Sequence, residues 1–326
     1  MLCIQHHFTD PYFNLAVDEY IFKHIDEDCF MLWRNDNAII VGKHQNTLAE
    51  INLDFVQEKD IKVVRRMSGG GAVYHDLGNL NFTFTKTNKE PSKVDFHHYT
   101  RPILDVLQNL GVNAEFQGRN DLVIDGKKFS GNAEYILKNK ILHHGTILFS
   151  SHMPDISGAL KANPLKFKDK AVKSIPKRVT NVMSHLAQPI SLDEFTDKVM
   201  AHIVATHDDC RPYTLTENDI KAIEKIRDEK YATWEWNFGS SPNYNFQQCI
   251  RTEGGTLEMH LDVHKGVIEQ CRIFGDFFTT KDISAIEDTL VGLRHDKKVI
   301  RKQLNKFDIS RYFHNMTADD LMSAMF

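Results

Sequence analysis

A series of short-turn signals in the first half of the chain constrains the fold more than any other feature of this sequence. The apolar residues 122–124 run into Asp125-Gly126, a dipeptide that favours a two-residue turn between strands. A second turn signal at residues 138–140 is followed by the apolar segment 141–149. Because strands joined by short turns pair antiparallel, this region predicts a mainly antiparallel sheet.

Helical segments flank these strands. In residues 12–25 apolar side chains recur every three or four positions, which is the pattern of a helix with one buried face. Residues 97–110 are typical of a helix that ends at Gly111, and Ser191 begins a capping-box sequence at the start of another helix. Together with the hairpins, these helices predict an α+β fold with helices on one side of the sheet, rather than a doubly wound fold.

Three further strands are expected before the hairpins. Residues 38–41 and 61–64 are rich in β-branched side chains. In residues 80–85, leucine and phenylalanine alternate with asparagine and threonine. This alternation predicts a strand with one buried face and one polar face.

Length and composition bear on the number of domains. A chain of 326 residues with 41% hydrophobic content can bury one large core or two cores, and two is the better expectation. Residues 234–242 break the helical pattern, and residues 255–274 predict another hairpin. We therefore expect a large domain over residues 1–245 and a small α+β domain over residues 246–326.

Charge and cysteine usage exclude several classes of protein. A net charge of -4 disfavours a generic nucleic-acid binder. No apolar run approaches the ~20 residues of a membrane helix, and the first residues lack the layout of a secretory signal. The 5 cysteines are scattered without Cys-x-x-Cys spacing, so neither a zinc site nor a disulfide framework is indicated. We expect a cytoplasmic monomer that binds neither nucleic acid nor membranes.

Residues 65–76 combine three successive glycines with reactive side chains. Two arginines precede Ser68, and His75 and Asp76 follow the glycines. Glycine lets backbone N–H groups approach a ligand closely, and guanidinium groups pair with carboxylates or phosphates. The spacing matches neither a P-loop nor a Rossmann fingerprint. We expect a tight turn between two strands that binds an anion.

Other polar clusters lie on the predicted hairpins, at residues 118–121, 127–133 and 143–146. Adjacent hairpins of an antiparallel sheet can bring such clusters into one cleft. Residues 161–178 carry seven basic side chains and one acidic side chain. This basic segment is either a solvated surface loop or a lid over a ligand that carries phosphate.

In these motifs the chain resembles the lipoate–protein ligases of the LplA class. The resemblance spans nearly the whole chain, because residues 234–242 and 267–278 also look like that family's junction and accessory domain. It implies a catalytic domain related to biotin ligases and class II aminoacyl-tRNA synthetases, followed by a small C-terminal domain. The matching motifs are residues 65–79, 118–122, 128–131, 143–146 and 178–181.

The resemblance implies an activity with two steps. Lipoate and MgATP give lipoyl-AMP and pyrophosphate, and a lysine of an apo lipoyl domain then takes the acyl group. The implied acceptors are 2-oxoacid dehydrogenase acyltransferase subunits and the glycine cleavage H protein, and no tightly bound prosthetic group is implied. A positioned lysine, backbone N–H groups and Mg²⁺ suit this chemistry because negative charge builds on the phosphate oxygens.

The resemblance also assigns residues. Lys128 is implied as the catalytic lysine at the lipoate carboxylate and α-phosphate, and Asp121 as the Mg²⁺ ligand. Asp76 and Asn79 are candidates for residues that fix turns instead. The lipoate-binding side chains are implied to be Arg66, Ser68, His75 and His144. The implied nucleotide-binding residues are Gly69, Gly70, Gly71, Ala72, Val73, Tyr74, Asn120, Asp121, Lys128, Gly145, Thr146, Arg178, Thr180 and Asn181.

Three alternatives stay open. A lipoyl or octanoyl transferase would need an activated thiol, but no cysteine lies between Cys29 and Cys210. A biotin ligase is disfavoured because the loop has the lipoate-type Ser-Gly-Gly-Gly form. A non-catalytic lipoate-binding protein would have kept the pocket alone, and Lys128 and Asp121 argue against it. The sequence does not identify the base that deprotonates the acceptor lysine.

Overall fold

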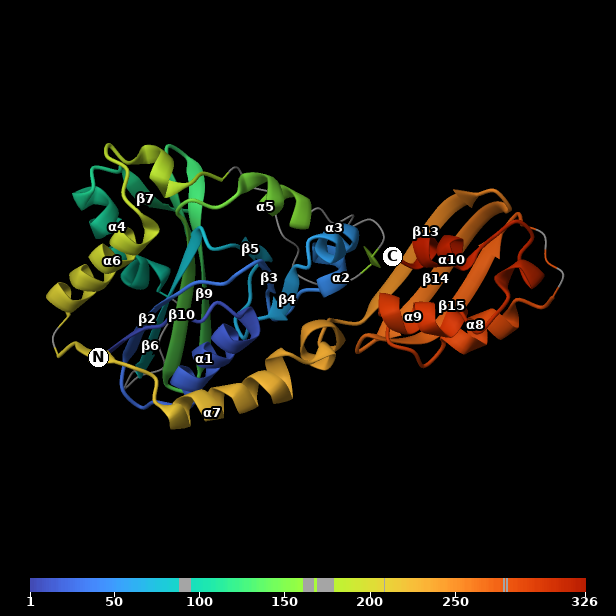
Figure 1. Cartoon of the computed structure of the whole chain (residues 1–326), viewed down its shortest axis with the longest axis horizontal. Helices are drawn as coiled ribbons and strands as arrows, with labels where there is room; N and C mark the ends of the chain where they lie inside the picture. The colour runs from blue at the N-terminus through green and yellow to red at the C-terminus, as the bar shows by residue number, and fades with distance from the viewer. Residues whose placement is uncertain (88–94, 161–166, 169–178, 208, 278, 280) are drawn as a thin grey trace. The chain divides into compact units, whose positions relative to one another are not determined.

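The computed structural model describes all of the chain except residues 88–94, 161–166, 169–178, 208, 278 and 280 (Figure 1). The chain forms two compact units. The first unit comprises Met1–Lys43, Phe55–Leu160 and Ser174–Thr233, and the second comprises His44–Asp54, Lys161–Lys173 and Trp234–Phe326. The expected boundary at 245/246 falls inside a strand, Tyr244–Thr252, whereas the chain passes between the units at Thr233 and Trp234.

An eight-stranded sheet organises the first unit, with the order β12-β1-β2-β6-β10-β9-β8-β7. Strands β12, β1 and β2 run parallel, and every pairing from β2 through β7 is antiparallel, so the prediction of a mainly antiparallel sheet is confirmed. The strands are β1 (Leu2–Gln5), β2 (Cys29–Trp33), β6 (Asn79–Thr87), β7 (Ala114–Gln117), β8 (Asp121–Ile124), β9 (Lys127–Leu137), β10 (Lys140–Leu148) and β12 (Arg211–Tyr213).

The predicted turns form as expected. Asp125 and Gly126 both have positive φ, 50° and 70°, which is the backbone of a two-residue turn whose twist matches that of the flanking strands. Lys138, with φ 56°, makes the turn between β9 and β10. The side chain of Ser191 accepts from the N–H of Glu194 and Glu194 bonds back, so the predicted capping box begins helix α6.

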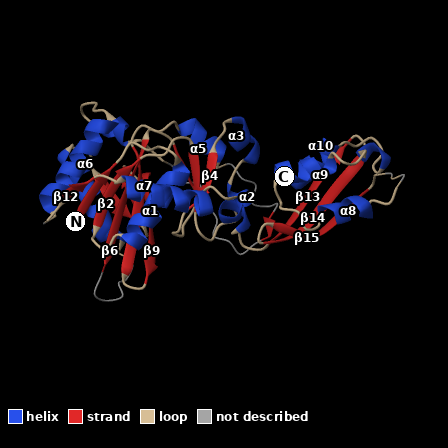
Figure 2. Cartoon of the chain, turned by 60° about the horizontal axis from the view of Figure 1, so that its bottom comes forward, coloured by secondary structure: helices blue, strands red, loops and turns tan. Residues whose placement is uncertain are grey.

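Helices cover both faces of the sheet, so the expectation of helices on one side is wrong (Figures 1 and 2). Helices α4 (Phe96–Asn109) and α6 (Leu192–Thr206) enclose a core with Phe30, Phe82 and Leu107. Helix α1 (Pro11–His24) lies on the opposite face, where it is buried almost all round because α7 (Glu217–Ile226) and the turn Arg227–Tyr231 pack against its outer side. The polar face expected for residues 80–85 is therefore buried as well.

A small sheet carries the glycine segment. Its order is β4-β3-β5, formed by β4 (Lys62–Arg65), β3 (Ala38–Val41) and β5 (Val73–His75). Because the fully buried β3 takes the central position, β4 and β5 are not neighbours. The glycine segment lies between two strands, as predicted, but it is a loop that crosses the end of β3 rather than a tight turn. Short helices α3 (Leu53–Glu58), α5 (Met153–Ala159) and Val182–His185 complete the unit.

The second unit is an antiparallel sheet with helices. Its predicted hairpin is confirmed, with its turn at Lys265 and Gly266, whose φ angles are 50° and 74°. The early helix α2 (Thr47–Glu50) belongs to this unit: the Thr47 hydroxyl donates to the Asn237 carbonyl at 2.6 Å, and Ala49 joins the core. The other elements are β11 (Phe167–Lys168), β13 (Tyr244–Thr252), β14 (Gly255–His264), β15 (Val267–Gly275), Glu235–Gly239, α8 (Ser284–Leu290), α9 (Lys297–Leu304), Ile309–Arg311 and α10 (Ala318–Met325).

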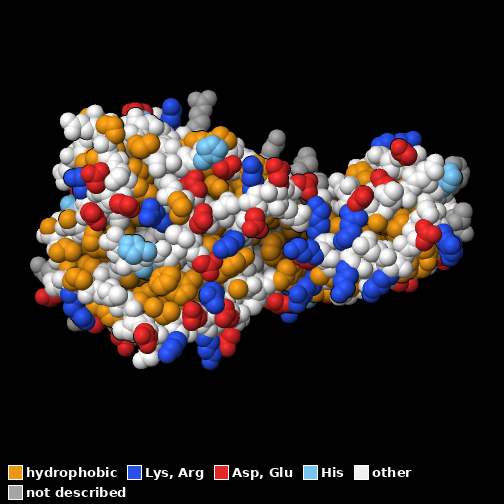
Figure 3. All heavy atoms as spheres, viewed as in Figure 1, with side chains coloured by type: hydrophobic (Ala, Val, Ile, Leu, Met, Phe, Trp, Pro, Cys, Tyr) orange, Lys and Arg blue, Asp and Glu red, His pale blue; other side chains and the backbone are white. Residues whose placement is uncertain are grey.

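Two surface properties bear on the class of protein. Within the part of the chain that is described, no helix has both the length and the apolar character needed to cross a membrane. On the face drawn in Figure 3, acidic and basic side chains of the described residues are interspersed over the first unit. This distribution differs from the basic stripe of a typical nucleic-acid-binding domain.

Candidate functional site

The Arg66 side chain organises the glycine loop from inside. Its Nε donates to the Ser68 hydroxyl at 3.0 Å and its Nη2 to the carbonyls of Gly69 and Gly71 at 2.6 and 2.9 Å, while Nη1 donates to Ile40 at 3.1 Å. Burial and the neighbouring Arg65 lower the pKa of Arg66 to about 10, and the side chain stays charged at neutral pH. Arg66, which the sequence predicts to bind the ligand directly, thus fixes the glycine loop instead.

Close approach of two backbones explains two of the glycines. A Cβ on Gly42, at the end of β3, would lie 2.1 Å from the carbonyl oxygen of Gly70. Gly70 itself has φ +92°, a conformation that side chains rarely adopt. Arg65 is fully buried and donates to the carbonyls of Gly42 and Lys43 at 2.9 and 3.0 Å. The loop is therefore fixed from β3 as well as from β4.

A chain of buried hydrogen bonds leads from this loop across the sheet to α1. The Ser68 hydroxyl lies 2.5 Å from Nε2 of His144, and His144 Nδ1 lies 2.8 Å from the Asp18 carboxylate. The other oxygen of Asp18 accepts from the Thr83 hydroxyl at 2.8 Å, and Thr83 accepts from the Trp33 indole N–H at 2.9 Å. Since the carboxylate only accepts, His144 carries a proton on Nδ1 and donates it to Asp18.

An apolar cluster adjoins this chain. Phe22 on α1, Met67 beside Ser68, and Leu142 are buried together, and Tyr135 packs against them. Side chains two apart on a strand share a face, so Leu142 and His144 both face α1. The site thus joins an apolar surface to a hydrogen-bonded polar one, which suits a carboxylic acid with an aliphatic body.

His75 reaches the same region from β5. It is buried, its Nδ1 lies 3.1 Å from the amide nitrogen of Asn35, and its ring meets the edge of Trp33 with centroids 6.4 Å apart. Burial, together with Arg66 and His144, lowers the pKa of His75 to about 3. The imidazole is therefore neutral at physiological pH.

The turn between β8 and β9 places Lys128 against a carboxylate. Lys128 Nζ lies 2.9 Å from Asp121, with side-chain exposures of 25% and 9%. A Cβ on Gly131 would come within 2.7 Å of Nζ, so the glycine leaves the space that the ammonium occupies. The glycine of the motif in residues 128–131 is thus explained by its close packing against the Lys128 ammonium group.

The segment after residue 178 meets this lysine. Val179 forms an isolated parallel bridge with Lys128, and the Thr180 N–H donates to the Lys128 carbonyl at 2.9 Å. The Asn181 amide bonds the backbone of Ser151 in both directions, at 3.0 and 2.9 Å. Two motifs about fifty residues apart in sequence therefore lie side by side.

Strand β10 links the two halves of the site. The Gly131 N–H donates to the Thr146 hydroxyl at 3.2 Å, and Thr146 is two residues from His144, about 7 Å along a strand. A Cβ on Gly145 would lie 2.1 Å from Oδ1 of Asn132, whose backbone carbonyl accepts from the Asn120 amide at 2.5 Å. The structure therefore brings together His144, Thr146 and the surroundings of Lys128.

The other residues predicted from the sequence lie on β5, next to it in sequence, or outside the described residues. Ala72 and Tyr74 are buried, Val73 is half-buried, and the Tyr74 hydroxyl donates to Asn37 at 3.0 Å. Asp76 accepts from the N–H groups of Gly78 and His152 at 2.9 and 2.7 Å, which is the turn-fixing role proposed for it. Arg178 lies outside the described residues, as does the rest of the basic segment 161–178 apart from Phe167–Lys168.

Asp121 is the carboxylate that could bind a Mg²⁺ ion beside Lys128. Among the residues with described positions, no group of three or more His, Cys, Asp or Glu side chains could hold a metal ion. Mg²⁺ is commonly bound by one or two carboxylates together with substrate phosphates, and it does not need a protein cage. The buried Asp121 carboxylate beside Lys128 fits that requirement.

Sequence reasoning missed several residues of the site, among them Asp18, Thr83, Trp33 and Asn35. A signal exists in α1: Asn14 and Asp18 are polar residues four apart, which puts them on one face of the helix. The sequence pattern predicts only one buried stripe, because one buried face is the usual expectation for a surface helix. That stripe consists of Phe13, Ala16, Val17, Tyr20, Ile21 and His24.

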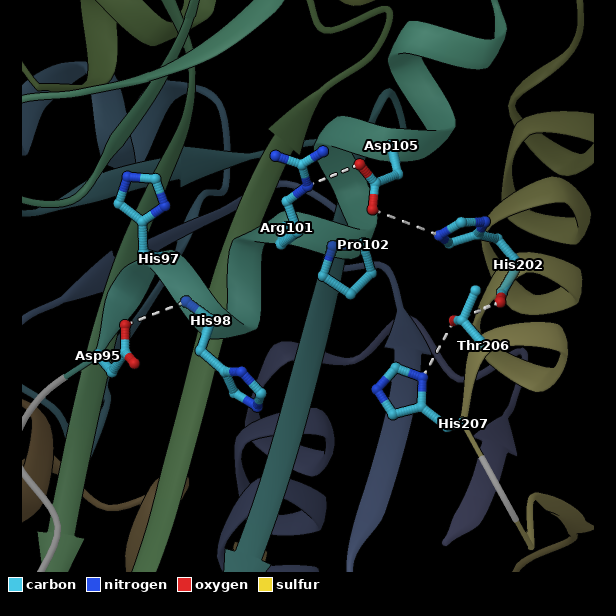
Figure 4. A pocket seen from close by; sticks show the side chains of 9 residues that line it. All are labelled: Asp95, His97, His98, Arg101, Pro102, Asp105, His202, Thr206 and His207. Carbon is cyan, nitrogen blue, oxygen red and sulfur yellow. Dashed lines mark hydrogen bonds and ion pairs between the residues drawn. The ribbon is translucent and has the colours of Figure 1, made fainter.

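A separate cavity of about 500 Å³ opens between α4 and α6 (Figure 4). It is lined by His97, His98, His202 and His207 with Arg101, Asp105 and others. Arg101 Nε donates to Asp105 at 2.7 Å, and His202 Nε2 lies 3.9 Å from the same carboxylate. Since α4 and α6 cover the sheet face opposite to α1, this cavity is distinct from the Ser68–His144 site.

Comparisons with known proteins agree on one family. The family profile of the lipoyl protein ligase A/B catalytic domain matches residues 10–204, and that of the bacterial lipoate protein ligase C-terminus matches residues 241–325. Lipoate-protein ligase LplJ of Bacillus subtilis (strain 168) is 43% identical over 98% of this chain and 97% of that protein.

Two solved structures are similar as well. A lipoate-protein ligase A bound with ATP has a TM-score of 0.64 and 27% identity, covering 74% of this chain and 100% of that chain. A bi-partite lipoate protein ligase of Thermoplasma acidophilum, from a study that includes its E2 lipoyl domain, has a TM-score of 0.62 and 28% identity. That match covers 73% of this chain and 96% of the other.

Proposed function

The chain belongs to the lipoate–protein ligase family, and from this premise we propose that it activates free lipoate with ATP and transfers the lipoyl group to a protein lysine. The observation that carries the proposal is the continuity of strands β9 and β10. They join the apolar cluster at Leu142 and the hydrogen-bonded His144 to the cation at Lys128 through the contact between Gly131 and Thr146.

In the first step a lipoate carboxylate oxygen attacks the α-phosphorus of ATP, and the bond to pyrophosphate breaks. Negative charge then builds on the α-phosphate oxygens. The Lys128 ammonium is placed to stabilise this charge, and its pairing with Asp121 keeps it in position before substrates bind. We propose that Mg²⁺, held by Asp121 and the phosphates, supplies further positive charge.

Ser68, His75 and His144 are proposed to bind the lipoyl group, supported by their burial beside the apolar cluster. Arg66 is proposed to act on lipoate through the loop that it holds. The nucleotide is proposed to lie along Gly69, Gly70 and Gly71, and near Thr180 and Asn181, and Arg178 stays a proposed nucleotide-binding residue.

In the second step the neutral amine of an acceptor lysine attacks the acyl carbon, AMP leaves, and the amine loses a proton. We propose lipoyl domains as acceptors, because the archaeal relative was solved in a study of a lipoylation system that includes its E2 lipoyl domain. The finer proposal names acyltransferase subunits of 2-oxoacid dehydrogenases and the glycine cleavage H protein.

A transferase would carry the acyl group on a reactive cysteine, and the two buried cysteines of the large sheet, Cys3 and Cys29, do not suit that role. Burial raises the pKa of Cys29 to about 11, and burial with the nearby Cys210 raises that of Cys3 to about 11. A thiol with so high a pKa is a poor nucleophile at neutral pH. This observation favours direct use of ATP.

We propose that the first unit carries catalysis, that the second unit is an accessory domain, and that the protein acts as a monomer. A cytoplasmic location is supported by 5 cysteines that are all free.

The test is release of pyrophosphate that depends on both lipoate and ATP, followed by mass spectrometry of an apo lipoyl domain. Lys128→Ala should abolish the release, whereas Lys127→Ala, which removes the exposed neighbour on the same turn, should leave it unchanged. Normal release by Lys128→Ala would remove the assignment. Release without any labelled acceptor would limit the function to adenylation.

A further inference from the structure

A buried chain of two amides leads to His75. Asn14 on α1, Asn35 after β2 and His75 on β5 are exposed by 0%, 0% and 3%. The Asn14 amide nitrogen lies 3.0 Å from Oδ1 of Asn35, and the Asn35 amide nitrogen lies 3.1 Å from Nδ1 of His75. Three polar side chains in a core are costly unless their hydrogen bonds are made, so the arrangement calls for a role.

Backbone carbonyls fix the direction of the whole chain. The same Asn14 nitrogen also lies 3.0 Å from the carbonyl of Phe8 and 2.8 Å from that of Arg34. Carbonyl oxygens only accept, so this atom of Asn14 must be its NH₂ group. The two hydrogens of this NH₂ group are shared among three acceptors, and the facing atom of Asn35 is the oxygen because a second NH₂ group at 3.0 Å would find no acceptor there. This orientation turns the Asn35 NH₂ group toward His75.

The tautomer of His75 follows. Because Asn35 donates to Nδ1, Nδ1 holds a lone pair, and a neutral imidazole must carry its proton on Nε2. The Nε2 atom is buried and has no hydrogen-bond partner among the described residues. A buried N–H donor without a partner costs about 1–3 kcal/mol, which a bound acceptor would recover.

We propose that Asn14 and Asn35 are positioning residues that hold His75 in the Nε2–H form, so that this N–H donates to an oxygen of the lipoyl carboxyl group. The inference rests on the proposed function for the identity of the acceptor, but the tautomer itself does not. The carboxyl oxygens are the strong acceptors that lipoate offers, whereas its sulfur atoms accept weakly.

The charged and titratable groups around His75 are consistent with a neutral donor. Arg66 approaches from the glycine loop, and His144 approaches from β10 with the Asp18 carboxylate on its far nitrogen. A second positive charge on His75 would be repelled by Arg66 in a buried site. The neutral imidazole would therefore orient the ligand through one directional N–H bond without adding a second positive charge beside Arg66.

The first test is the tautomer. The full-length protein labelled with ¹⁵N-histidine is examined by long-range ¹H–¹⁵N NMR, and His75→Gln identifies the His75 signals. We expect a single neutral form protonated on Nε2, whose Nε2 proton shifts when lipoate is added. A form protonated on Nδ1, or a mixture of the two, would overturn the inference even if pyrophosphate release is normal.

The second test changes the donor. In Asn35→Asp a carboxylate replaces the NH₂ group and draws a proton to Nδ1, so neutral His75 then presents a lone pair at Nε2. At a pH where NMR shows Nε2 without its proton, KM for lipoate should be about 10- to 100-fold higher than in the wild type. At a pH where Nε2 keeps its proton, KM should match the wild type. The pH is varied to reach both conditions. KM that does not follow the state of Nε2 would contradict the proposal.

Asn37→Asp is the matched control. Asn37 is two residues from Asn35 but half-buried and outside the chain to His75: its amide donates to the Lys59 carbonyl at 2.7 Å, and its oxygen accepts from the Tyr74 hydroxyl, a bond that aspartate can keep. This variant should keep the wild-type KM for lipoate at every pH. If lipoate and ATP release no pyrophosphate from the wild type while Nε2 carries the proton, the proposed function fails and the tautomer assignment stands.

Discussion

Replacing Gly131 with alanine tests whether Lys128 acts from the position described. A Cβ at residue 131 would lie 2.7 Å from Nζ and 2.9 Å from Cε of Lys128. Carbon and nitrogen atoms in contact normally stay about 3.5–4.0 Å apart, so one of the two groups must move. Because the lysine side chain is flexible and the strand is not, we expect the ammonium to leave its place beside Asp121.

The expected magnitudes separate catalysis from stability. Losing one positioned donor at a developing oxyanion costs about 3–4 kcal/mol, which is about 10²- to 10³-fold in the rate of pyrophosphate release. The ion pair of the half-buried Lys128 with the buried Asp121 contributes about 1 kcal/mol to folding after allowance for solvent screening, so Tm should fall by only about 2–4 °C. Release is measured with a coupled pyrophosphate assay, and Tm by calorimetry.

A double variant supplies the control. In Lys128→Ala the group that meets the new methyl is gone, so adding Gly131→Ala should leave Tm unchanged. Pyrophosphate release by Gly131→Ala within about threefold of the wild type would refute the reasoning, since a threefold change is below 1 kcal/mol. An equal loss of Tm in both backgrounds would also refute it, because the clash would then lie elsewhere.

Two further predictions concern stability. Gly42→Ala places a Cβ 2.1 Å from the Gly70 carbonyl oxygen. Because the backbone cannot rotate away as a side chain can, we expect a denaturant titration to show about 2–3 kcal/mol of destabilisation. An unchanged free energy of unfolding would mean that the loop is not fixed from β3. Burial lowers the pKa of His75 from its ordinary value of about 6.5 to about 3, so between these pH values the unfolded chain binds more protons than the folded one, and stability is lost as pH falls below about 6.5. His75→Gln should reduce that slope of unfolding free energy against pH by up to about 1.4 kcal/mol per unit; an unchanged slope would place the proton uptake on other groups.

The sequence predicted the local features of this fold well, because their causes are local. The two-residue turn at Asp125-Gly126 and the cap at Ser191 depend on neighbouring residues alone. The placement of Lys128 beside Gly131 was not predicted, because residues three apart on a regular strand face opposite sides and the register shift between β8 and β9 lies between them.

Features that depend on distant segments were not predictable in the same way. The course of the glycine loop depends on β3 lying between β4 and β5, and nothing within residues 65–76 indicates this. The roles of Asp18 and Asn35 depend on β5 and β10, which lie far along the chain. A polar residue in an apolar helix signals a buried partner, but the partner itself appears only when the sheet is assembled.

The second unit takes up one segment from the early part of the chain. Thr47 bonds Asn237 and Ser241, and Ala49 packs into a core built otherwise from residues beyond 243. Cleavage of the peptide bond between Thr233 and Trp234 would therefore not give two independent fragments. The long N-terminal fragment would keep residues 44–54, which pack into the core of the C-terminal fragment. The two fragments should therefore reassociate through these residues, as in fragment complementation. For the same reason, deletion of the C-terminal part would expose residues 44–54 and lower solubility.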